Sequence, residues 1–196
     1  MPVKADAPVF VVTGPSGAGK GTLIKLVLPR FPALALAVSA TTRARRPGEE
    51  DGVDYWFLDR SEFERRVYAG EFLEEVDYVG NRYGTLQSEI DRLREQGKSP
   101  VLELETDGAL RVAERVPGAV TIFVTAPVEE LERRLRERAT ESSGEIGERI
   151  ATARRQLELL PRFDHVVANV DREHAADELA AVIAPMLTRA ATMARP

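Results

Sequence analysis

A glycine-rich segment between an apolar run and a helical pattern constrains this chain more than any other feature. The apolar run Val9–Val12 is followed by Gly14-Pro15-Ser16-Gly17-Ala18-Gly19-Lys20-Gly21-Thr22, and a helical pattern opens at Thr22. Glycines let successive backbone N–H groups turn toward one point, and the N-terminal end of the following helix adds positive potential there. A buried strand, this loop and a helix together form the setting that a phosphate-binding loop (P-loop) requires.

Lys20 would place an ammonium group on the β- and γ-phosphates of a nucleotide held by this loop. Position 21 holds glycine, whereas many P-loops have the Ser or Thr that ligates Mg²⁺ there. Thr22 carries the nearest hydroxyl, so no protein ligand is assigned to a metal, and Mg²⁺ is expected to be held mainly by phosphate oxygens and water. The alternative, a flexible glycine-rich turn without a ligand, does not account for the strand and helix on either side. The loop alone indicates a nucleoside triphosphate but not the reaction.

Size and composition favour one compact body that works in the cytoplasm. With 196 residues, a single domain with inserted lobes is favoured over two independent domains. The net charge of −5 gives no overall basic field for nucleic acid or an anionic membrane. The absence of cysteine excludes disulfides, thiolate zinc sites and cysteine nucleophiles, and only His165 and His174 offer imidazoles. No run approaches the ~20 apolar residues of a membrane span, and the start of the chain lacks a secretory signal.

Short apolar runs alternate with amphipathic segments, a pattern that predicts βαβ units and a parallel sheet. The expected strands are Val9–Thr13, Leu34–Val38, Val101–Leu104, Ala119–Val124 and Val166–Asn169, and the expected core helices are Thr22–Leu28 and Ala175–Leu187. Pro29 is expected to stop the first helix. The tail from Ala190 is expected to be frayed.

Two segments interrupt this alternation. Residues 39–90 combine charged and aromatic residues with turn signals, which predicts a mostly β substrate lobe with a helix at Ser61–Ala69. Residues 127–157 predict two highly charged helices joined by Ser142-Ser143-Gly144, which we interpret as a lid. The core of the single domain is then formed by residues 8–38, 91–126 and 158–190.

Four further blocks of sequence join the P-loop to indicate a family. They are Ser39 to Phe57 with Thr41-Thr42-Arg43, Arg46, Gly48-Glu49 and Gly52-Val53-Asp54-Tyr55-Trp56-Phe57, then Glu71-Phe72-Leu73-Glu74, Gly80-Asn81-Arg82-Tyr83-Gly84-Thr85, and Glu103-Leu104-Glu105-Thr106-Asp107-Gly108. In order and spacing the chain resembles the guanylate kinases. The resemblance implies a P-loop NTPase fold, a three-layer α/β structure with a parallel core sheet, an inserted mostly β GMP-binding lobe and a helical lid.

The resemblance also implies an activity and its partners. The γ-phosphoryl group of ATP, with Mg²⁺, would be transferred to GMP or dGMP to give ADP and GDP, in purine nucleotide metabolism and GMP recycling. ATP and GMP or dGMP are then the partners, without nucleic acid or membrane, and the assembly is a monomer or a homodimer. The whole segment from Gly14 to Thr22 and Lys20 within it would bind ATP.

Residues of the expected substrate lobe suit a phosphate monoester. Arg43 and Arg46 carry planar guanidinium groups that can hold a dianion, and Tyr55 and Tyr83 can each donate an O–H to the same oxygens. Glu49 can orient the arginines. A solvated charged loop beside core tyrosines is the alternative for an isolated arginine-rich turn.

Other residues suit a guanine base. Glu74 can accept from the N1–H and 2-amino donors of guanine, whereas adenine offers no matching pair. The resemblance places Ser39 and Thr85 at guanine O6 and N7. Glu105 stands at the end of an expected core strand, where open α/β sheets bind ligands. It replaces the family's usual Asp, Asp107 replaces the usual Gln, and Glu105 would bind the guanine or its ribose side and orient water around Mg²⁺.

Three arginines of the expected lid correspond to family positions that close over the triphosphate. Arg134 and Arg138 lie four residues apart and share one face of the expected helix Val128–Ala139. Arg149 is expected to start the next helix. Ion pairs on a solvated helix explain Arg133 and Arg136, with Glu130–Arg134 and Glu132–Arg136 as the expected pairs. Near the last strand, Asn169 resembles the residue that contacts adenine, and Gln156 stands where the family often has Glu.

Two other functions fit parts of the sequence. A P-loop kinase could act on another acceptor, such as AMP, a pyrimidine monophosphate or a small hydroxylated metabolite, and Glu74 is the residue that argues for guanine. Guanylate-kinase-like modules can also be scaffolds that bind phosphopeptides without catalysis. Such modules typically lack a working P-loop, whereas this chain keeps Gly19, Lys20 and the lid arginines.

Overall fold

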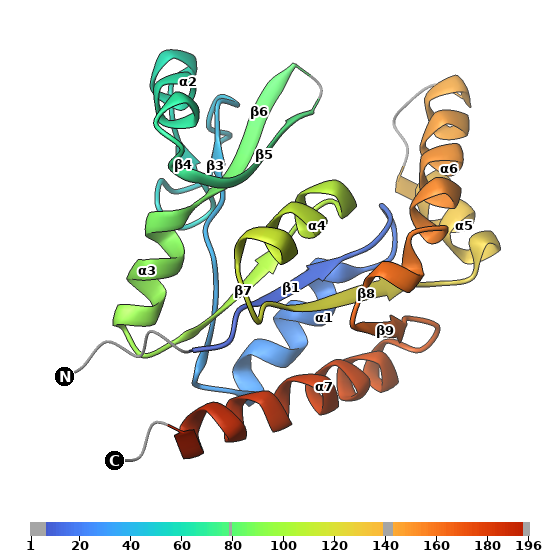
Figure 1. Cartoon of the computed structure of the whole chain (residues 1–196). Coiled ribbons are helices and arrows are strands. Elements are labelled where there is room, and N and C mark those ends of the chain that lie inside the picture. Colours follow the sequence, from blue (N-terminus) through green and yellow to red (C-terminus); the bar gives the residue numbers. More distant parts are fainter. Residues whose placement is uncertain (1–6, 79, 139–142, 194–196) are drawn as a thin grey trace.

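The core of the molecule is a five-stranded parallel sheet (Figure 1). The computed structural model describes residues 7–78, 80–138 and 143–193. The strand order is β2-β7-β1-β8-β9, so that β1 lies in the middle and its carboxyl end is flanked by those of β7 and β8. The strands are β1 (Phe10–Thr13), β2 (Leu34–Leu36), β7 (Ser99–Glu103), β8 (Val120–Thr125) and β9 (His165–Ala168).

Helices cover both faces of this sheet. They are α1 (Lys20–Val27) and α7 (Arg172–Met193) on one face and α3 (Gln87–Glu95) and α4 (Thr106–Arg115) on the other, with 3-10 turns η1 (Leu28–Arg30) and η2 (Leu160–Arg162). Phe10 and Val12 of β1 pack with α1 and α7, whereas Val9 and Val11 pack with α3 and α4. Because both faces are buried, the four successive residues Val9–Val12 are all apolar, as expected for a central parallel strand.

A second sheet of four strands stands above one end of the core in Figure 1, in the order β4-β3-β6-β5. Its elements are β3 (Ala40–Thr41), β4 (Trp56–Phe57), α2 (Arg60–Tyr68), β5 (Phe72–Tyr78) and β6 (Asn81–Leu86). β5 and β6 pair antiparallel, and β3 lies between β6 and β4. A separate apolar cluster of Ala40, Phe63, Phe72 and Leu86 supports this sheet, and the Phe63 and Phe72 rings stack with centroids 4.4 Å apart.

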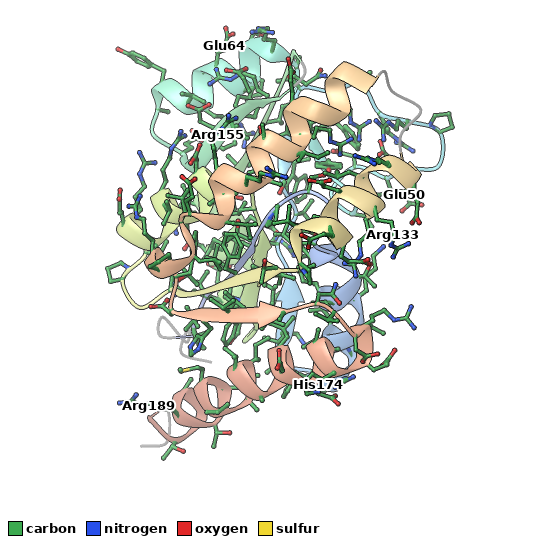
Figure 2. The ribbon with its side chains drawn as sticks, turned by 90° about the vertical axis from the view of Figure 1, so that its right-hand side faces the viewer. Glu50, Glu64, Arg133, Arg155, His174 and Arg189 are labelled. Atoms are coloured by element: carbon green, nitrogen blue, oxygen red, sulfur yellow. The ribbon has the colours of Figure 1, made fainter. Side chains whose placement is uncertain are left out.

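Two charged helices, α5 (Val128–Arg138) and α6 (Ser143–Leu157), rise on the opposite side of the core from the second sheet (Figure 1). Figure 2 views this side directly and labels Arg133 on α5 and Arg155 on α6, both of which are exposed. The helices are laced by ion pairs, and Arg154 joins them through a 3.0 Å contact with Glu132. The expected pairs Glu130–Arg134 and Glu132–Arg136 are present at 2.6 Å and 3.8 Å.

The expected α/β fold class with a parallel core sheet is confirmed, and several boundaries are corrected. The first helix begins at Lys20 rather than Thr22. Arg149 lies in the middle of α6, because the helix begins at Ser143 and tolerates Gly147 at a cost of about 1 kcal/mol relative to alanine. The last helix continues past Ala190 to Met193. None of the helices in the described ranges is long and apolar enough to cross a membrane.

Two helices were not among the elements expected from the sequence. α3 straddles residue 90, where the substrate lobe was expected to end, and so connects the second sheet to β7. α4 follows β7 directly, and its buried residues Thr106, Gly108, Ala109 and Val112 recur at helical spacing. Two of these four residues, Thr106 and Gly108, are not strongly apolar. The helical periodicity of this short segment is therefore a weak signal in the sequence.

Candidate functional site

The P-loop joins β1 to α1 and depends on glycine at three positions. Gly14, Gly17 and Gly19 have φ angles of +136°, +87° and +88°, which other residues rarely adopt. A Cβ at Gly14 would lie 1.9 Å from the carbonyl oxygen of Val124 in β8. The loop can therefore pass this close to β8 only with glycine at position 14.

Lys20 occupies the first turn of α1 and folds over the loop. Its side chain is buried, and Nζ donates to the carbonyl oxygen of Gly14 at 2.5 Å and to that of Pro15 at 3.4 Å. The Ala18 N–H donates to the Pro15 carbonyl at 3.1 Å and closes the turn. The ammonium group is thus held at the centre of the loop, beside the positive N-terminal end of α1.

Asn169 and Arg134 fasten the outside of the P-loop. Asn169, which follows β9 and is 4% exposed, donates from Nδ2 to the carbonyl oxygen of Ala18 at 2.7 Å. Arg134 donates to the carbonyl oxygens of Gly17 at 3.3 Å and Asn169 at 3.1 Å, while Glu130 accepts from its Nε at 2.6 Å. In this structure both side chains bind the protein's own backbone and fix the shape of the loop.

Arg149 of the second charged helix reaches the P-loop. Arg149 Nη2 donates to Ser16 Oγ at 2.8 Å. Arg138 is the last residue of α5, and its side chain lies outside the described part of the structure. Of the three expected lid arginines, Arg134 and Arg149 therefore contact the loop directly.

A second cluster of polar side chains comes from the four-stranded sheet and its loops. Glu49 accepts from the Arg43 guanidinium at 2.7 Å and from the backbone N–H of Arg46 at 2.8 Å. These contacts raise the pKa of Arg43 and lower the pKa of Glu49. The expectation that Glu49 orients the arginines therefore has a geometric basis: one carboxylate bridges the side chain of Arg43 and the backbone at Arg46.

Tyr55 and Tyr83 complete this cluster. Their rings meet edge to face with centroids 6.0 Å apart, and the Arg43 guanidinium lies 5.3 Å from the centre of the Tyr55 ring. Burial raises the pKa of Tyr55, so its hydroxyl keeps its proton and can donate. Arg43, Arg46, Tyr55 and Tyr83 thus line one space, and their role as a site for a dianion stays a prediction.

Glu74 on β5 is a buried carboxylate beside this cluster. It is 4% exposed and accepts from Thr85 Oγ1 of β6 at 3.0 Å. Burial raises its pKa, and the bond from Thr85 partly opposes that shift. Thr85 is itself 1% exposed, so its hydroxyl acts on Glu74 in this structure. Ser39 precedes β3 and lines the same space.

One cleft of about 740 Å³ joins the P-loop to the second cluster. Among the expected site residues, its walls include Pro15, Ser16, Gly17, Gly19, Lys20, Gly21, Thr22, Ser39, Arg43, Arg46, Glu49, Tyr55, Glu74, Tyr83 and Glu105. Gly14, Ala18, Thr85, Arg134 and Asn169 lie behind these walls and contact lining residues or the loop. The structure thus brings the P-loop and the second polar cluster to one space, although they come from separate parts of the sequence.

The floor of the cleft lies at the carboxyl end of β7. The Glu103 carboxylate sits against the start of α1, since a Cβ at Gly21 would lie 3.0 Å from its Oε2. Desolvation raises the pKa of Glu103, and the charge of Lys20 opposes this. Sequence reasoning singled out Glu105 and missed Glu103, although its position at the strand end was a usable signal. With glycine at position 21 the carboxylate keeps this place, whereas a Cβ there would push it aside by a few tenths of an ångström.

Glu105 lies farther along the same floor and meets the second charged helix. Gln156 of α6 donates from Nε2 to Glu105 Oε2 at 3.4 Å. In the described residues, no group of three or more His, Cys, Asp or Glu side chains is placed to hold a metal ion. The carboxylates of Glu103 and Glu105 on the floor are therefore separate groups and, within the described ranges, do not form a metal-binding cluster with a third such side chain.

Fold and cleft define a P-loop protein of the α/β class, with the loop at the carboxyl end of the central strand and an opposed arginine–tyrosine cluster. The family model of guanylate kinase matches residues 7–186. The chain belongs to the guanylate kinase family.

Individual relatives agree with this assignment. The chain is 50% identical to a guanylate kinase of Rubrobacter xylanophilus over 172 residues, which cover 87% of this chain and 90% of the relative. It is 42% identical to one from Symbiobacterium thermophilum over 184 residues, covering 93% and 87%. The crystal structure of guanylate kinase from Anaplasma phagocytophilum superposes with a TM-score of 0.71 at 29% identity, covering 91% of this chain and 85% of that one.

Proposed function

We propose that this protein transfers the γ-phosphoryl group of ATP to GMP, giving ADP and GDP. The observation that carries the proposal is the single cleft in which the P-loop faces the cluster of Arg43, Arg46, Tyr55 and Tyr83. A phosphotransferase with two phosphorylated substrates needs two such surfaces, one for each. Guanylate kinase is also the activity in the names of the relatives described above.

The P-loop side would hold the donor. Backbone N–H groups of residues 14–22 would surround the β- and γ-phosphates, and the α1 N-terminus would add its positive potential. Lys20 would exchange its bonds with the Gly14 and Pro15 carbonyls for phosphate oxygens. Because Asn169 donates to the Ala18 carbonyl, we assign it a role in holding the loop alongside the adenine contact implied by the resemblance.

The opposite side would hold the acceptor. Arg43 and Arg46 would bind the phosphate of GMP with the hydroxyls of Tyr55 and Tyr83, and Glu49 would keep Arg43 in place. The phosphate oxygen that attacks is already anionic at neutral pH, so the chain need not supply a general base. Its task is to align the oxygen with the γ-phosphorus and to stabilise the charge that spreads over the transferred group.

The base would be read by Glu74. Ionised, its two oxygens can accept from the N1–H and 2-amino groups of guanine. Thr85 fixes the carboxylate through Oε1, and Ser39 offers a hydroxyl in the same pocket for the opposite edge of the base. Glu105 lies on the floor between base and ribose in this assignment. dGMP would be accepted as well, because no assigned contact requires the 2′-hydroxyl.

Arginines of α5 and α6 would stabilise the transferred phosphoryl group. Arg149 already contacts Ser16 of the P-loop, and Arg134 contacts Gly17. Arg138 shares the face of Arg134, four residues later on the same helix. We therefore assign residues 127–157 as a lid, residues 39–90 as the GMP-binding lobe, and residues 8–38, 91–126 and 158–190 as the core.

The donor set of the cleft fits Mg²⁺ held mostly by phosphate oxygens and water. Glu103 offers a hard oxygen donor beside Gly21, and Thr22 offers a hydroxyl at the cleft wall. When bound with ATP, the ion would neutralise charge on the β- and γ-phosphates. Glu103 and Glu105 would orient the water around it. A cytoplasmic location, where ATP and GMP are found, and a monomeric or homodimeric state complete the proposal.

Formation of ADP in a coupled assay tests this function. Wild-type protein is supplied with ATP, Mg²⁺ and in turn GMP, dGMP, AMP, CMP and UMP, with Lys20→Ala as the control for the P-loop. We expect turnover with GMP and dGMP well above the others and its loss in the control. Preference for any other acceptor would overturn the base assignment, and absence of turnover with GMP binding intact would favour a non-catalytic module.

A further inference from the structure

The strand that carries Glu74 is interrupted at the residue before it. In the β5–β6 pair, Phe72 lies opposite Leu86 and Glu74 opposite Thr85, so that Leu73 is an extra residue in β5. Such a bulge bends the strand and re-aims the side chains beside it. The position of Glu74 therefore depends on what holds this irregular backbone.

Arg115 of α4 holds the backbone at the bulge. Its Nη1 donates to the carbonyl oxygens of Phe72 at 3.0 Å and Leu73 at 2.9 Å. Both acceptors lie immediately before Glu74. A single guanidinium group thus holds two successive peptide groups. In a regular pair of strands, hydrogen bonds to the neighbouring strand would hold such groups.

Arg111, one turn earlier on α4, holds the backbone on the other side of Glu74. Its Nη1 donates to the carbonyl oxygen of Glu75 at 2.7 Å. Burial raises the pKa of Glu74, and among the opposing influences the positive charge of Arg111 lowers it, while the Glu75 carboxylate raises it further. Arg111 therefore acts on the placement of Glu74 and on its charge.

Gly108 provides the space that the Glu74 side chain occupies. A Cβ at this position would lie 2.8 Å from Glu74 Oε2. Gly108, Arg111 and Arg115 are spaced i, i+3 and i+7, which puts them on one face of α4. Figure 1 shows α4 between the core sheet and the β5–β6 pair, so this face joins the base-reading strand to the core.

We propose that Gly108, Arg111 and Arg115 form a positioning stripe that sets the selectivity of Glu74 for a purine carrying two adjacent ring-edge donors, N1–H and a 2-amino group. The inference rests on the proposed function. The arginines do not touch the substrate in this assignment and act through the backbone around Glu74. Without them the bulge can relax, the carboxylate loses its fixed direction, and the second of the two bonds to guanine becomes weaker.

The test compares Arg111→Gln and Arg115→Gln with a matched control. Arg94→Gln removes the same kind of contact elsewhere, because Arg94 of α3 donates through Nε and Nη2 to the carbonyl oxygen of Ala7. Steady-state kinetics with GMP and IMP, whose base lacks the 2-amino group, are combined with calorimetric binding of GMP and with thermal unfolding. Arg115→Lys, which restores one donor and the charge, is the conservative variant.

Each glutamine variant of the stripe is expected to raise the KM for GMP by about 3- to 10-fold, the size of one ordinary net hydrogen bond, because the contact with guanine is weakened and not removed. The KM for ATP and kcat at saturating GMP stay within about twofold of wild type, and the preference for GMP over IMP shrinks. Arg115→Lys recovers part of the loss, and Arg94→Gln leaves these ratios unchanged. Gly108→Ala gives the same shift by displacing the carboxylate.

An unchanged GMP-to-IMP ratio in both arginine variants would overturn the proposal, as would equal effects in Arg94→Gln. If Arg115→Gln does not fold, Arg111→Gln and Arg115→Lys decide. Wild-type protein that binds GMP without turning it over would refute the proposed kinase activity alone, since calorimetry still measures the stripe. Absence of GMP binding in the wild type would refute both.

Discussion

Arg149 Nη2 lies 2.8 Å from Ser16 Oγ, and this contact joins the middle of α6 to the P-loop. This contact brings a guanidinium group from the proposed lid to the place where the donor phosphates would bind. The Ser16 hydroxyl is a neutral acceptor, so a phosphate oxygen would compete well for the arginine. The arginine is thus near its proposed working position before any substrate arrives.

We expect Arg149→Ala to lower kcat by about 10³-fold or more, as removal of an arginine finger does, while the KM for GMP changes little. The reason is that the charge of the transferred group develops in the transition state and is absent from bound GMP. Arg155→Ala on the same helix is the control, because Arg155 is exposed and donates to Thr152 Oγ1 of its own helix. Equal turnover in the two variants would remove Arg149 from the proposed catalytic group.

Glu89 on α3 connects the core to the second sheet. The carboxylate is 2% exposed and accepts from the Val38 N–H at 3.0 Å, from Trp56 Nε1 at 3.4 Å and from Arg92 at 2.7 Å. Val38 precedes β3, and Trp56 lies in β4. Glu89 itself lies on α3, where the chain returns to the core, so this side chain links the two connections between core and lobe and also holds β4.

Glu89→Gln is expected to lower the free energy of unfolding by about 1–3 kcal/mol, because an amide NH₂ would face donors that now share the carboxylate. Urea denaturation followed by tryptophan fluorescence measures this, since Trp56 is the sole tryptophan. The exposed Glu95→Gln on the same helix should leave stability within about 0.5 kcal/mol of wild type. Similar midpoints for the two variants would show that the buried contacts contribute little.

The P-loop could be predicted from the sequence because its parts are contiguous. Gly14, Gly19 and Lys20 stand at fixed spacing between a strand and a helix, so local pattern determines the geometry. The arginine stripe of α4 could not, because it depends on a bulge at Leu73 and on contacts between β5 and arginines 36 to 43 residues away in the sequence. Glu103 falls between these cases, since its strand was predicted but its contact with Gly21 is tertiary.

Glu74 illustrates a conflict between stability and binding. Burial raises its pKa above the unfolded value, so the folded state is favoured when the carboxyl is protonated. This stability is fully present below the unfolded pKa and is lost as pH rises through the folded pKa. At neutral pH the ionised side chain is therefore a cost to folding, which the proposed guanine contact requires.

Glu74→Gln is accordingly expected to be at least as stable as the wild type at pH 7 to 8, with an advantage that shrinks as pH falls toward the unfolded value of about 4.3. Its kcat/KM for GMP should fall by about 10²- to 10⁴-fold, the loss of two charge-assisted bonds. Thermal unfolding across this pH range and kinetics at pH 7.5 measure the two effects. An advantage of the variant that grew as the pH fell would contradict this prediction, because it would mean that folding lowers the pKa of Glu74.

Closure of the cleft is the last expectation. Reacting atoms must approach to about 3–3.5 Å, and bulk water must be kept from the γ-phosphorus. The P-loop and the cluster around Arg43 lie on opposite walls of a space of about 740 Å³, carried by separate elements. The proposed lobe and lid are therefore expected to approach each other when both substrates are bound.

Small-angle scattering should show a smaller radius of gyration for the protein with both GMP and a non-hydrolysable ATP analogue than for the protein with either ligand alone. Closure is driven by contacts that each wall makes with the substrate bound on the other wall. One ligand alone supplies only part of these contacts. Arg43→Ala is the control, because removing this guanidinium weakens the acceptor side while leaving the P-loop intact. Superimposable curves for the free and doubly liganded wild type, at concentrations that saturate both sites, would mean that the open cleft is already the working form.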